Sequence, residues 1–203
     1  MNRRNLNLGK YIVPEDTRNG VCLEVGANVG SFTEKYMFHF NTIHYYEPLT
    51  ECFNYIKSKI GSYSHIVGQN LAGYKTSGEV LNMLLHQNRD SGSTGLESPT
   101  LNEEWTDNII QSVTTIALED MIANLEVEEI DYCKSDCETS EYSIFLGKDL
   151  SKLKYIGIEL HWQMGHEKYN ELVRYFLLTH ELIHGDATYT PHTNKEVLFK
   201  RLK

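Results

Sequence analysis

The sequence predicts an α/β fold in which a parallel sheet carries helices on both faces. After residue 20, short apolar runs of strand length alternate with longer stretches of helical periodicity. Repeated strand–helix units form parallel sheets, because each helix carries the chain back to the start of the next strand. A chain of 203 residues fits one such unit. We therefore expect a single domain over residues 1–203, with 1–19 as a polar N-terminal lead segment.

The first half of the chain is expected to supply three strands and two helices. Strands are predicted over the apolar runs 21–25, 42–46 and 65–71. A helix is predicted from Ser31 to Phe40, because Ser31 and Glu34 have the spacing of a capping box. A second helix is predicted from Pro48 to about Lys59, because proline fits the first turn of a helix.

The middle of the chain is less regular, and the alternation then resumes. Residues 78–86 are expected to form an added strand. Residues 87–108 are polar and rich in glycine and serine, which predicts a long loop inserted on the substrate side. The remaining expected elements are extended segments at 112–116, 181–185 and 196–202, strands at 129–134 and 155–160, and helices at 118–125, 141–153 and 167–179.

The loops after the first two strands indicate the ligand, because parallel sheets bind ligands at the carboxyl ends of their strands. In the loop Gly26–Gly30, glycines let the backbone turn tightly and approach a ligand. This loop lacks the dinucleotide spacing G-x-G-x-x-G and the lysine of a P-loop, which indicates a ligand without a diphosphate. Glu47 follows the next strand, where an acidic side chain accepts hydrogen bonds from ribose hydroxyls. With Glu24 available for an ammonium group, the pattern predicts S-adenosylmethionine as the cofactor.

Titratable side chains follow the fourth and fifth expected strands. Asp136 and Glu138 come after the fourth, and Glu159 and His161 alternate onto one face of the fifth. Methyl transfer to a hydroxyl needs a group that removes the proton, and a histidine or a carboxylate at a strand end suits that role. The candidate catalytic residues are therefore Asp136, His161 and Glu138, with structural ion pairs as the other interpretation. Glu141 is expected to cap its helix or to form a salt bridge.

Composition and charge limit the class of partner. The net charge is −9 and no dense basic stretch is present, which argues against a nucleic-acid substrate and favours a small or neutral acceptor. No segment reaches the roughly 18 apolar residues that a membrane span needs. Met1–Lys10 lacks the apolar run of a secretory signal. The expectation is a soluble cytoplasmic protein whose cysteines are reduced.

Six segments of the sequence carry a family resemblance. They are Glu24–Thr33, Tyr46–Pro48, Gln69–Ala72, Val113–Ile122, Ile130–Glu138 and Ile156–His161. Over about residues 20–185 the chain resembles the FkbM-type methyltransferases, a branch of the class I S-adenosylmethionine-dependent enzymes. The resemblance implies a Rossmann-like, seven-stranded, mostly parallel sheet whose last strand is antiparallel and whose two C-terminal runs form a closing hairpin. It also implies methylation of an oxygen on a sugar or another small metabolite.

The same resemblance assigns the parts of a cofactor site. The segment from Glu24 to Phe32 would line the methionine moiety, Glu47 the ribose, and Asn70 to Ala72 the adenine. The region around Asp136 would face the transferred methyl group. The cofactor-binding residues implied are Glu24, Gly26, Ala27, Asn28, Gly30, Ser31, Phe32, Glu47, Pro48, Asn70, Leu71 and Ala72.

The sequence departs from the family pattern in two segments. The family usually has aspartate where Glu24 stands, so the side chain here reaches farther. Thr139 and Ser140 replace the two small residues of the family segment Val-Glu-Gly-Ala-Glu. Because of Thr139 and Ser140, a domain that binds S-adenosylmethionine but has lost catalysis remains an alternative.

One further motif points to a different class of protein. His180-Glu-Leu-Ile-His184 matches the H-E-x-x-H pattern of zinc peptidases. That chemistry needs both histidines on one face of a long helix and a third ligand downstream. Ala187 and Thr190 stand where Gly and His are needed, and the segment is expected to run into a strand. A zinc metallopeptidase is thus a remote alternative, and no metal site is predicted. An NAD-dependent oxidoreductase is also a remote alternative, because this sequence lacks the glycine-rich loop that binds the diphosphate of NAD.

Overall fold

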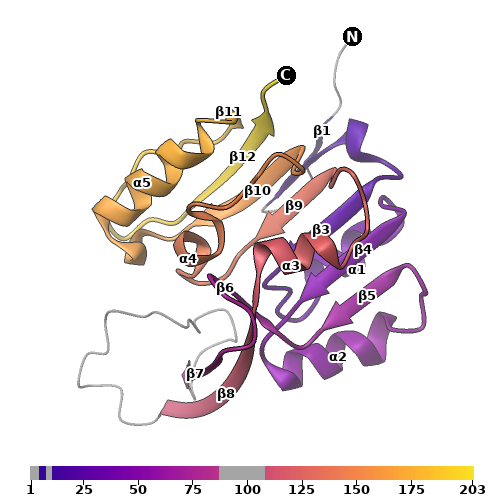
Figure 1. Ribbon diagram of the computed structural model, residues 1–203. Helices are drawn as coiled ribbons and strands as arrows, with labels where there is room; N and C mark the ends of the chain where they lie inside the picture. Colours follow the sequence, from indigo (N-terminus) through magenta and orange to yellow (C-terminus); the bar gives the residue numbers. More distant parts are fainter. Residues whose placement is uncertain (1–4, 8–10, 87–107) are drawn as a thin grey trace.

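The computed structural model describes residues 5–7, 11–86 and 108–203, and its centre is a seven-stranded sheet (Figure 1). The strand order is β11-β12-β10-β9-β3-β4-β5. The strands are β3 (Val21–Val25), β4 (Thr42–Tyr46), β5 (Ile66–Gln69), β9 (Tyr132–Ser135), β10 (Tyr155–Leu160), β11 (His180–His184) and β12 (Lys195–Arg201). β12 pairs antiparallel with β10 and β11, and all other pairs in this sheet are parallel. The predicted sheet, including its closing hairpin, is confirmed.

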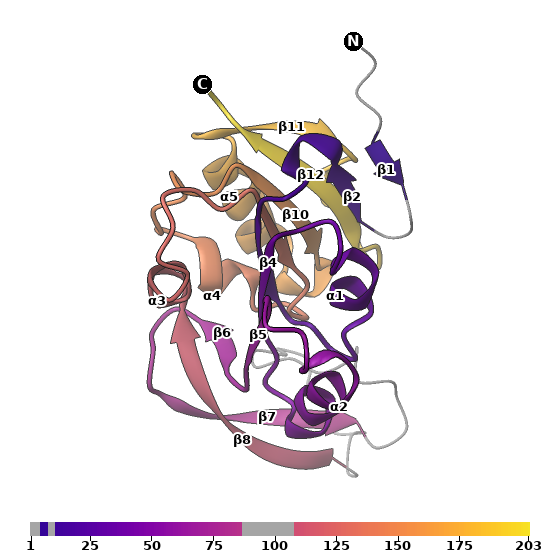
Figure 2. The same cartoon turned by 90° about the vertical axis from the view of Figure 1, so that its right-hand side faces the viewer.

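Helices cover both faces of the sheet (Figure 2). One face carries α1 (Ser31–Tyr36) and α2 (Thr50–Ile60), and the other carries α3 (Leu118–Ala123), α4 (Glu141–Phe145) and α5 (His166–Phe176). Because both faces are covered, the central strands are buried on each side, which explains their nearly continuous apolar sequences. In the part of the chain that the structure describes, no helix has the length and apolar character needed to cross a membrane.

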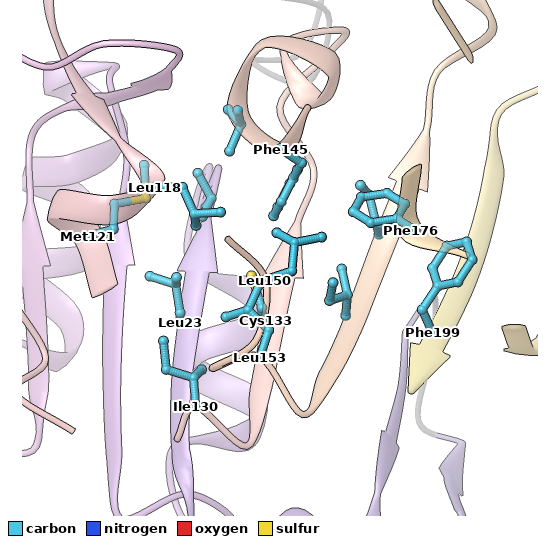
Figure 3. Close-up of a cluster of buried hydrophobic side chains, with 14 of the residues drawn as sticks. Leu23, Leu118, Met121, Ile130, Cys133, Phe145, Leu150, Leu153, Phe176 and Phe199 are labelled. Carbon is cyan, nitrogen blue, oxygen red and sulfur yellow. The ribbon is translucent and has the colours of Figure 1, made fainter. Parts of the chain in front are cut away.

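The larger core lies between the sheet and the helices α3, α4 and α5 (Figure 3). Leu23 and Cys133 of the sheet meet Met121, Phe145 and Phe176 of the three helices, and all five side chains are fully buried. The rings of Phe145 and Phe176 pack edge to face with centroids 5.5 Å apart. This core fixes the sheet on the side away from α1, so the carboxyl ends of β3, β9 and β10 form a rigid base for a site.

The N-terminal segment contains structure that was not predicted from the sequence. β1 (Asn5–Asn7) pairs antiparallel with β2 (Ile12–Pro14), and a short 3-10 helix, η1 (Glu15–Thr17), follows. Val13 of β2 is fully buried in a second core beneath α1 and α2. A three-residue strand with one inward-facing valine gives too weak a period-2 pattern to detect in the sequence.

A smaller, three-stranded sheet stands beside the carboxyl end of β5. Its order is β6 (Ala72–Tyr74), β8 (Asn108–Ala117) and β7 (Val80–His86). β7 and β8 correspond to the predicted segments 78–86 and 112–116, whereas β6 was not expected. The predicted substrate-side loop at 87–108 lies outside the described residues, apart from its last residue.

Several predicted helix boundaries were wrong. α1 begins at Ser31 as predicted but ends at Tyr36 rather than at Phe40, and α3 and α5 also end two to three residues early. The capping box of α1 does not form, because Gly30 in the left-handed conformation is the N-cap and Glu34 instead pairs with Lys59 at 2.9 Å. α2 begins at Thr50 rather than at Pro48. α4 ends at Phe145, and Gly147 in the following turn has φ +74°, a conformation that does not continue a helix.

Candidate cofactor and acceptor site

A cavity of about 600 Å³ opens at the carboxyl ends of β3, β4, β9 and β10, where the sequence analysis expected a ligand. A volume of this size suits a small-molecule ligand. Residues from both halves of the sheet line it: Tyr11, Glu24, Gly26, Ala27, Asn28, Val29, Ser31, Phe32, Lys35, Tyr36, Glu47, Pro48, Leu49, Ala72, Gly73, Met83, Lys134, Asp136, Cys137, Glu138, Ser140, Glu159, Gln163 and Asn194. Nine of the twelve expected cofactor residues are among them.

Gly26 and Gly30 shape the first wall of the cavity. Both have φ +77°, and a Cβ added at Gly26 would lie 2.0 Å from the carbonyl oxygen of Asp136. A Cβ at Gly30 would lie 2.9 Å from Ile56 Cγ1. The close approach that the glycines allow is therefore between segments of the protein itself, and this packing sets the position of the loop beside the cavity. Gly30 does not line the cavity.

Glu47 is held rigidly at the end of β4. Its Oε2 accepts a hydrogen bond from the backbone N–H of Asn28 at 2.6 Å, and its Oε1 accepts one from the N–H of Leu49 at 2.8 Å. Burial raises the pKa of Glu47 to about 7, although both backbone hydrogen bonds lower it. The carboxylate is thus fixed in one orientation, and each oxygen keeps a further lone pair for a ligand hydroxyl.

Glu24 and Lys134 form a buried pair at the base of the cavity. They are register partners on the adjacent strands β3 and β9, and Lys134 Nζ lies 3.6 Å from Glu24 Oε1. Glu24 Oε2 accepts a hydrogen bond from the Thr33 hydroxyl, while Lys134 donates to the carbonyl oxygen of Gly26. Among the described residues, Glu24 Oε1 is buried without a hydrogen-bond partner. Lys134 was not among the predicted site residues, although a lysine inside the run 130–135 was a signal for it.

Of the three residues expected beside the adenine, Ala72 lines the cavity, and its neighbour Gly73 also does. The Asn70 amide donates to the carbonyl oxygens of Glu47 and Pro48, at 2.8 and 2.9 Å, and so braces the β4–α2 loop from behind. Leu71 packs against the larger core. Asn70 and Leu71 therefore stand outside the cavity lining.

An acidic cluster surrounds His161 on the other side of the cavity. We use this term for Asp136, Glu138, Glu141 and Glu159. His161 Nε2 lies 3.4 Å from Glu138 Oε2 and 3.8 Å from both Asp136 Oδ1 and Glu159 Oε2. On the far side of the ring, Nδ1 lies 3.1 Å from Glu141 Oε1. The three candidate catalytic residues are thus brought together, with His161 behind the carboxylates and Asp136, Glu138 and Glu159 on the cavity wall.

The charge on His161 is set by these neighbours. Burial alone would lower the pKa of the ring, but the carboxylates of Glu141 and Glu138 outweigh burial and raise it to about 11. At neutral pH the ring therefore holds its proton when nothing else contacts Nε2. In that state His161 cannot act as a proton acceptor, and this role is left to the carboxylates.

The loop that presents Glu138 is strained. Glu138 has φ +48° and Thr139 has φ +90°, a region that a β-branched residue rarely adopts. Thr139 stands where the resembling family has glycine. Backbone strain of this kind persists only where the surrounding structure holds the residue in place. Here the strained residue Glu138 carries the carboxylate that lies closest to His161 Nε2.

Thr139→Gly is expected to raise the free energy of unfolding by up to about 1 kcal/mol, because relief of the left-handed conformation exceeds the entropic cost of glycine. Urea unfolding measures this change. Ser140→Gly is the matched control, because Ser140 has φ −77° and gains no relief, so it should lose stability. A less stable Thr139→Gly protein would mean that the side chain of Thr139 contributes more than its backbone strain costs.

The H-E-x-x-H motif does not form a zinc-peptidase site. His180–His184 is the strand β11, so the two histidines do not share a helical face. His180 is buried, with Nε2 2.9 Å from the carbonyl oxygen of Leu153, whereas His184 is exposed. These residues therefore form one strand of the closing hairpin, in which β11 pairs with β12.

Comparison with known proteins gives one family and one fold. A sequence profile described as "Methyltransferase FkbM domain" matches residues 24–187. No curated protein matches the sequence significantly. Similar solved structures include the FkbM methyltransferase of Methylobacillus flagellatus (14% identity, TM-score 0.56). The match covers 90% of this chain but only 43% of that protein's length. A Streptococcus mutans protein described as a methyltransferase, in complex with SAH, matches over the whole of both chains (9% identity, TM-score 0.53). The pre-rRNA processing protein fibrillarin of Methanococcus jannaschii matches 94% of this chain and 70% of its own (10% identity, TM-score 0.55).

Proposed function

Because the chain belongs to the FkbM family of S-adenosylmethionine-dependent methyltransferases, we propose that it methylates a hydroxyl oxygen of a small polar metabolite such as a sugar. The observation that carries this proposal is the pairing, in one cavity, of a wall suited to a nucleoside with a carboxylate-rich wall. The first wall is formed by the loop after β3 and by Glu47. The second contains Asp136, Glu138 and Glu159.

The residues of the first wall fit S-adenosylmethionine, which when bound supplies an electrophilic methyl group on its sulfonium. Glu24 Oε1 faces Lys134 Nζ at 3.6 Å but has no hydrogen-bond partner among the described residues, and an ammonium group of the ligand would supply one. Glu47 offers a fixed carboxylate to two ribose hydroxyls. Ala72 leaves room for a flat ring, because its side chain is a single methyl group, whereas a side chain at Gly73 would point toward Val25 and Ile144 of the core.

The second wall is suited to a hydroxyl acceptor. Glu138 is 26% exposed at its side chain and lines the cavity, so it can receive the proton that the acceptor loses. Asp136 lies on the same wall and can hydrogen-bond the acceptor. His161 holds its own proton behind them and keeps the carboxylates in place. We assign the proton transfer to Glu138, with Asp136 as the group that positions the acceptor and His161 as the group that orients both carboxylates.

The charge of the chain favours a small acceptor over RNA. Fibrillarin, a pre-rRNA processing protein, shares the fold but only 10% of the sequence. A net charge of −9 opposes a phosphate backbone, whose binding depends on clustered Lys and Arg. The cavity wall that would face an acceptor is itself acidic. An uncharged, hydroxyl-rich molecule therefore suits this wall better than a polyanion does.

Two measurements test the proposal. Calorimetric titration with S-adenosylhomocysteine should show one site per chain. Transfer of labelled methyl from S-adenosylmethionine should then be assayed against separate pools of sugars, other hydroxylated metabolites and RNA. Label in a hydroxylated small molecule supports the proposal, while label in RNA contradicts the acceptor class. Cofactor binding with no transfer to any pool, by parent and Thr139→Gly alike, would favour the binding-only alternative.

The affinity for S-adenosylhomocysteine is expected to rise roughly tenfold between pH 6 and pH 8, because the Glu47 pKa of about 7 must be crossed before its carboxylate can accept both ribose hydroxyls. Without ligand the sign is opposite: a pKa raised above its unfolded value stabilises the fold at low pH, and that contribution is lost as pH rises through about 7. Calorimetry at several pH values measures the first effect, and thermal unfolding measures the second.

Glu47→Gln is the control for this pH dependence. It should bind S-adenosylhomocysteine more weakly by about 1–3 kcal/mol at pH 8, since one hydroxyl loses its acceptor. Any titration of the ligand itself remains in this variant, so the difference between the two proteins reports Glu47 alone. Equal slopes in the parent and in Glu47→Gln would remove Glu47 from the ribose site.

A further inference from the structure

The Nε2 atom of His161 is a buried nitrogen without a hydrogen-bond partner among the described residues. Its side chain is 0% exposed. Three carboxylates face this atom at 3.4 to 3.8 Å, but none of these contacts has hydrogen-bond geometry. A buried nitrogen aimed into a group of carboxylates, yet bonded to none of them, is the arrangement expected where a cation completes the contacts.

The opposite nitrogen of the ring is already committed. His161 Nδ1 is hydrogen-bonded to Glu141 Oε1 at 3.1 Å, and the same oxygen accepts the N–H of Cys137 at 2.7 Å. Glu141 is fully buried, so it fixes the ring in one orientation. Histidines that bind metals commonly donate the other ring N–H to a carboxylate in this way, which leaves the lone pair of Nε2 for the ion.

The geometry of three side chains suits a single ion. Asp136, Glu159 and His161 each offer one ligand atom, and these atoms all lie within 4.8 Å of one another. Ligands on opposite sides of an ion with bonds of about 2.1 Å are about 4.2 Å apart. The distances of 3.8 Å from Nε2 to Asp136 Oδ1 and to Glu159 Oε2 fall inside that span. Asn194 donates to Glu159 Oε1 at 3.2 Å, which leaves Oε2 turned toward the ring.

The charge balance also favours a cation. Four carboxylates face one imidazole ring, so negative charge is in excess even when the ring is protonated. Of the lysines among the described lining residues, Lys134 is paired with Glu24 and with the carbonyl oxygen of Gly26, and Lys35 lies over the ring of Tyr36 on α1. A divalent ion would offset more of this charge than a proton does, and it would do so at the same place.

We propose that Asp136, Glu159 and His161 bind one divalent cation on the acceptor side of the cavity. One imidazole with two carboxylates suits Mn²⁺, since carboxylates favour Mg²⁺ and Mn²⁺ whereas imidazole favours the later transition metals. Asp136 and Glu159 line the cavity, so the open coordination positions face it.

The role of this ion rests on the proposed function. The oxygen of the acceptor hydroxyl would bind the ion, which lowers the pKa of the hydroxyl. The O–H bond then breaks, the electron pair stays on the oxygen, and the proton moves to the carboxylate of Glu138. Glu138 is thereby separated in role from the three ligands.

Mn²⁺ binding to the full chain tests the site directly. Chelator-treated protein is titrated with Mn²⁺ alone, and the unbound ion is followed by its electron paramagnetic resonance signal. We expect one Mn²⁺ per chain and a rise in the unfolding temperature on saturation. Asp136→Asn and Glu159→Gln should each weaken binding at least roughly tenfold, and Glu141→Gln about ten- to a hundredfold through loss of ring orientation. Glu51→Gln, which removes an exposed carboxylate on α2, should bind Mn²⁺ as the parent does.

The outcomes separate this inference from the proposed function, because neither cofactor nor acceptor is present. No bound Mn²⁺ at millimolar concentration, or equal binding by the parent, Asp136→Asn and Glu159→Gln, overturns the metal site. Thermal unfolding of each metal-free variant identifies any that fails to fold, and the site is then judged on the other variant. Cofactor binding without Mn²⁺ binding would leave the proposed function intact, whereas Mn²⁺ binding without S-adenosylhomocysteine binding would contradict only that function.

Discussion

Gly26→Ala is expected to abolish S-adenosylhomocysteine binding and to lower the free energy of unfolding by about 2–4 kcal/mol. The added Cβ would lie 2.0 Å from the carbonyl oxygen of Asp136, and it would stand on a backbone with φ +77°. The opposing segment cannot move away freely, because the N–H of Asp136 donates to the carbonyl oxygen of Val25 at 3.1 Å. The two loops must separate, which displaces both walls of the cavity together.

Gly147→Ala is the matched control for this substitution. Gly147 has φ +74°, almost the same conformation, but a Cβ there would meet no atom within 4 Å. It should lose only the roughly 1–2 kcal/mol of left-handed strain and keep its affinity for S-adenosylhomocysteine. Urea unfolding and calorimetry measure both properties. If the two variants lose equal stability and both still bind the ligand, the contact between Gly26 and Asp136 does not shape the cavity.

The sequence was sufficient for the sheet because its strands are short, apolar and interrupted by turn residues. β3, β4 and β10 have the predicted boundaries, residue for residue. Helix ends were less predictable, because they depend on contacts that spacing does not reveal. Glu34 has capping-box spacing, but Lys59 of the neighbouring helix α2 engages its carboxylate instead.

The site was predictable only in part, for a similar reason. Strand ends place Asp136, Glu138 and His161 at one edge of a parallel sheet, so their proximity follows from the order of elements. Whether a side chain faces the cavity or braces the wall behind it depends on tertiary packing. Asn70 was expected beside the adenine and instead holds the β4–α2 loop, and Glu141 is the fully buried partner of His161 Nδ1.

His161→Ala is expected to lower the free energy of unfolding of the metal-free protein by about 3–5 kcal/mol, the cost of leaving buried carboxylates without their cation. Glu141 is the residue most affected, because it is fully buried and its Oε2 has no hydrogen-bond partner among the described residues. His161→Gln restores a donor to Glu141 but no charge, and it should recover only part of the loss. Denaturant unfolding in the presence of a chelator measures both values.

The comparison with His180→Ala decides whether charge or burial is responsible. His180 is buried to the same extent, at 1% exposed, but its Nε2 contacts the carbonyl oxygen of Leu153 and no carboxylate is paired with it in the described structure. Its removal should cost about 1–3 kcal/mol, the price of one unsatisfied carbonyl and a small cavity. A loss as large as that of His161→Ala would assign the effect to packing alone. A clearly smaller loss means that the acidic cluster requires a positive partner at His161. Four carboxylates around one ring at the ligand cavity would then be an arrangement that holds a cation there.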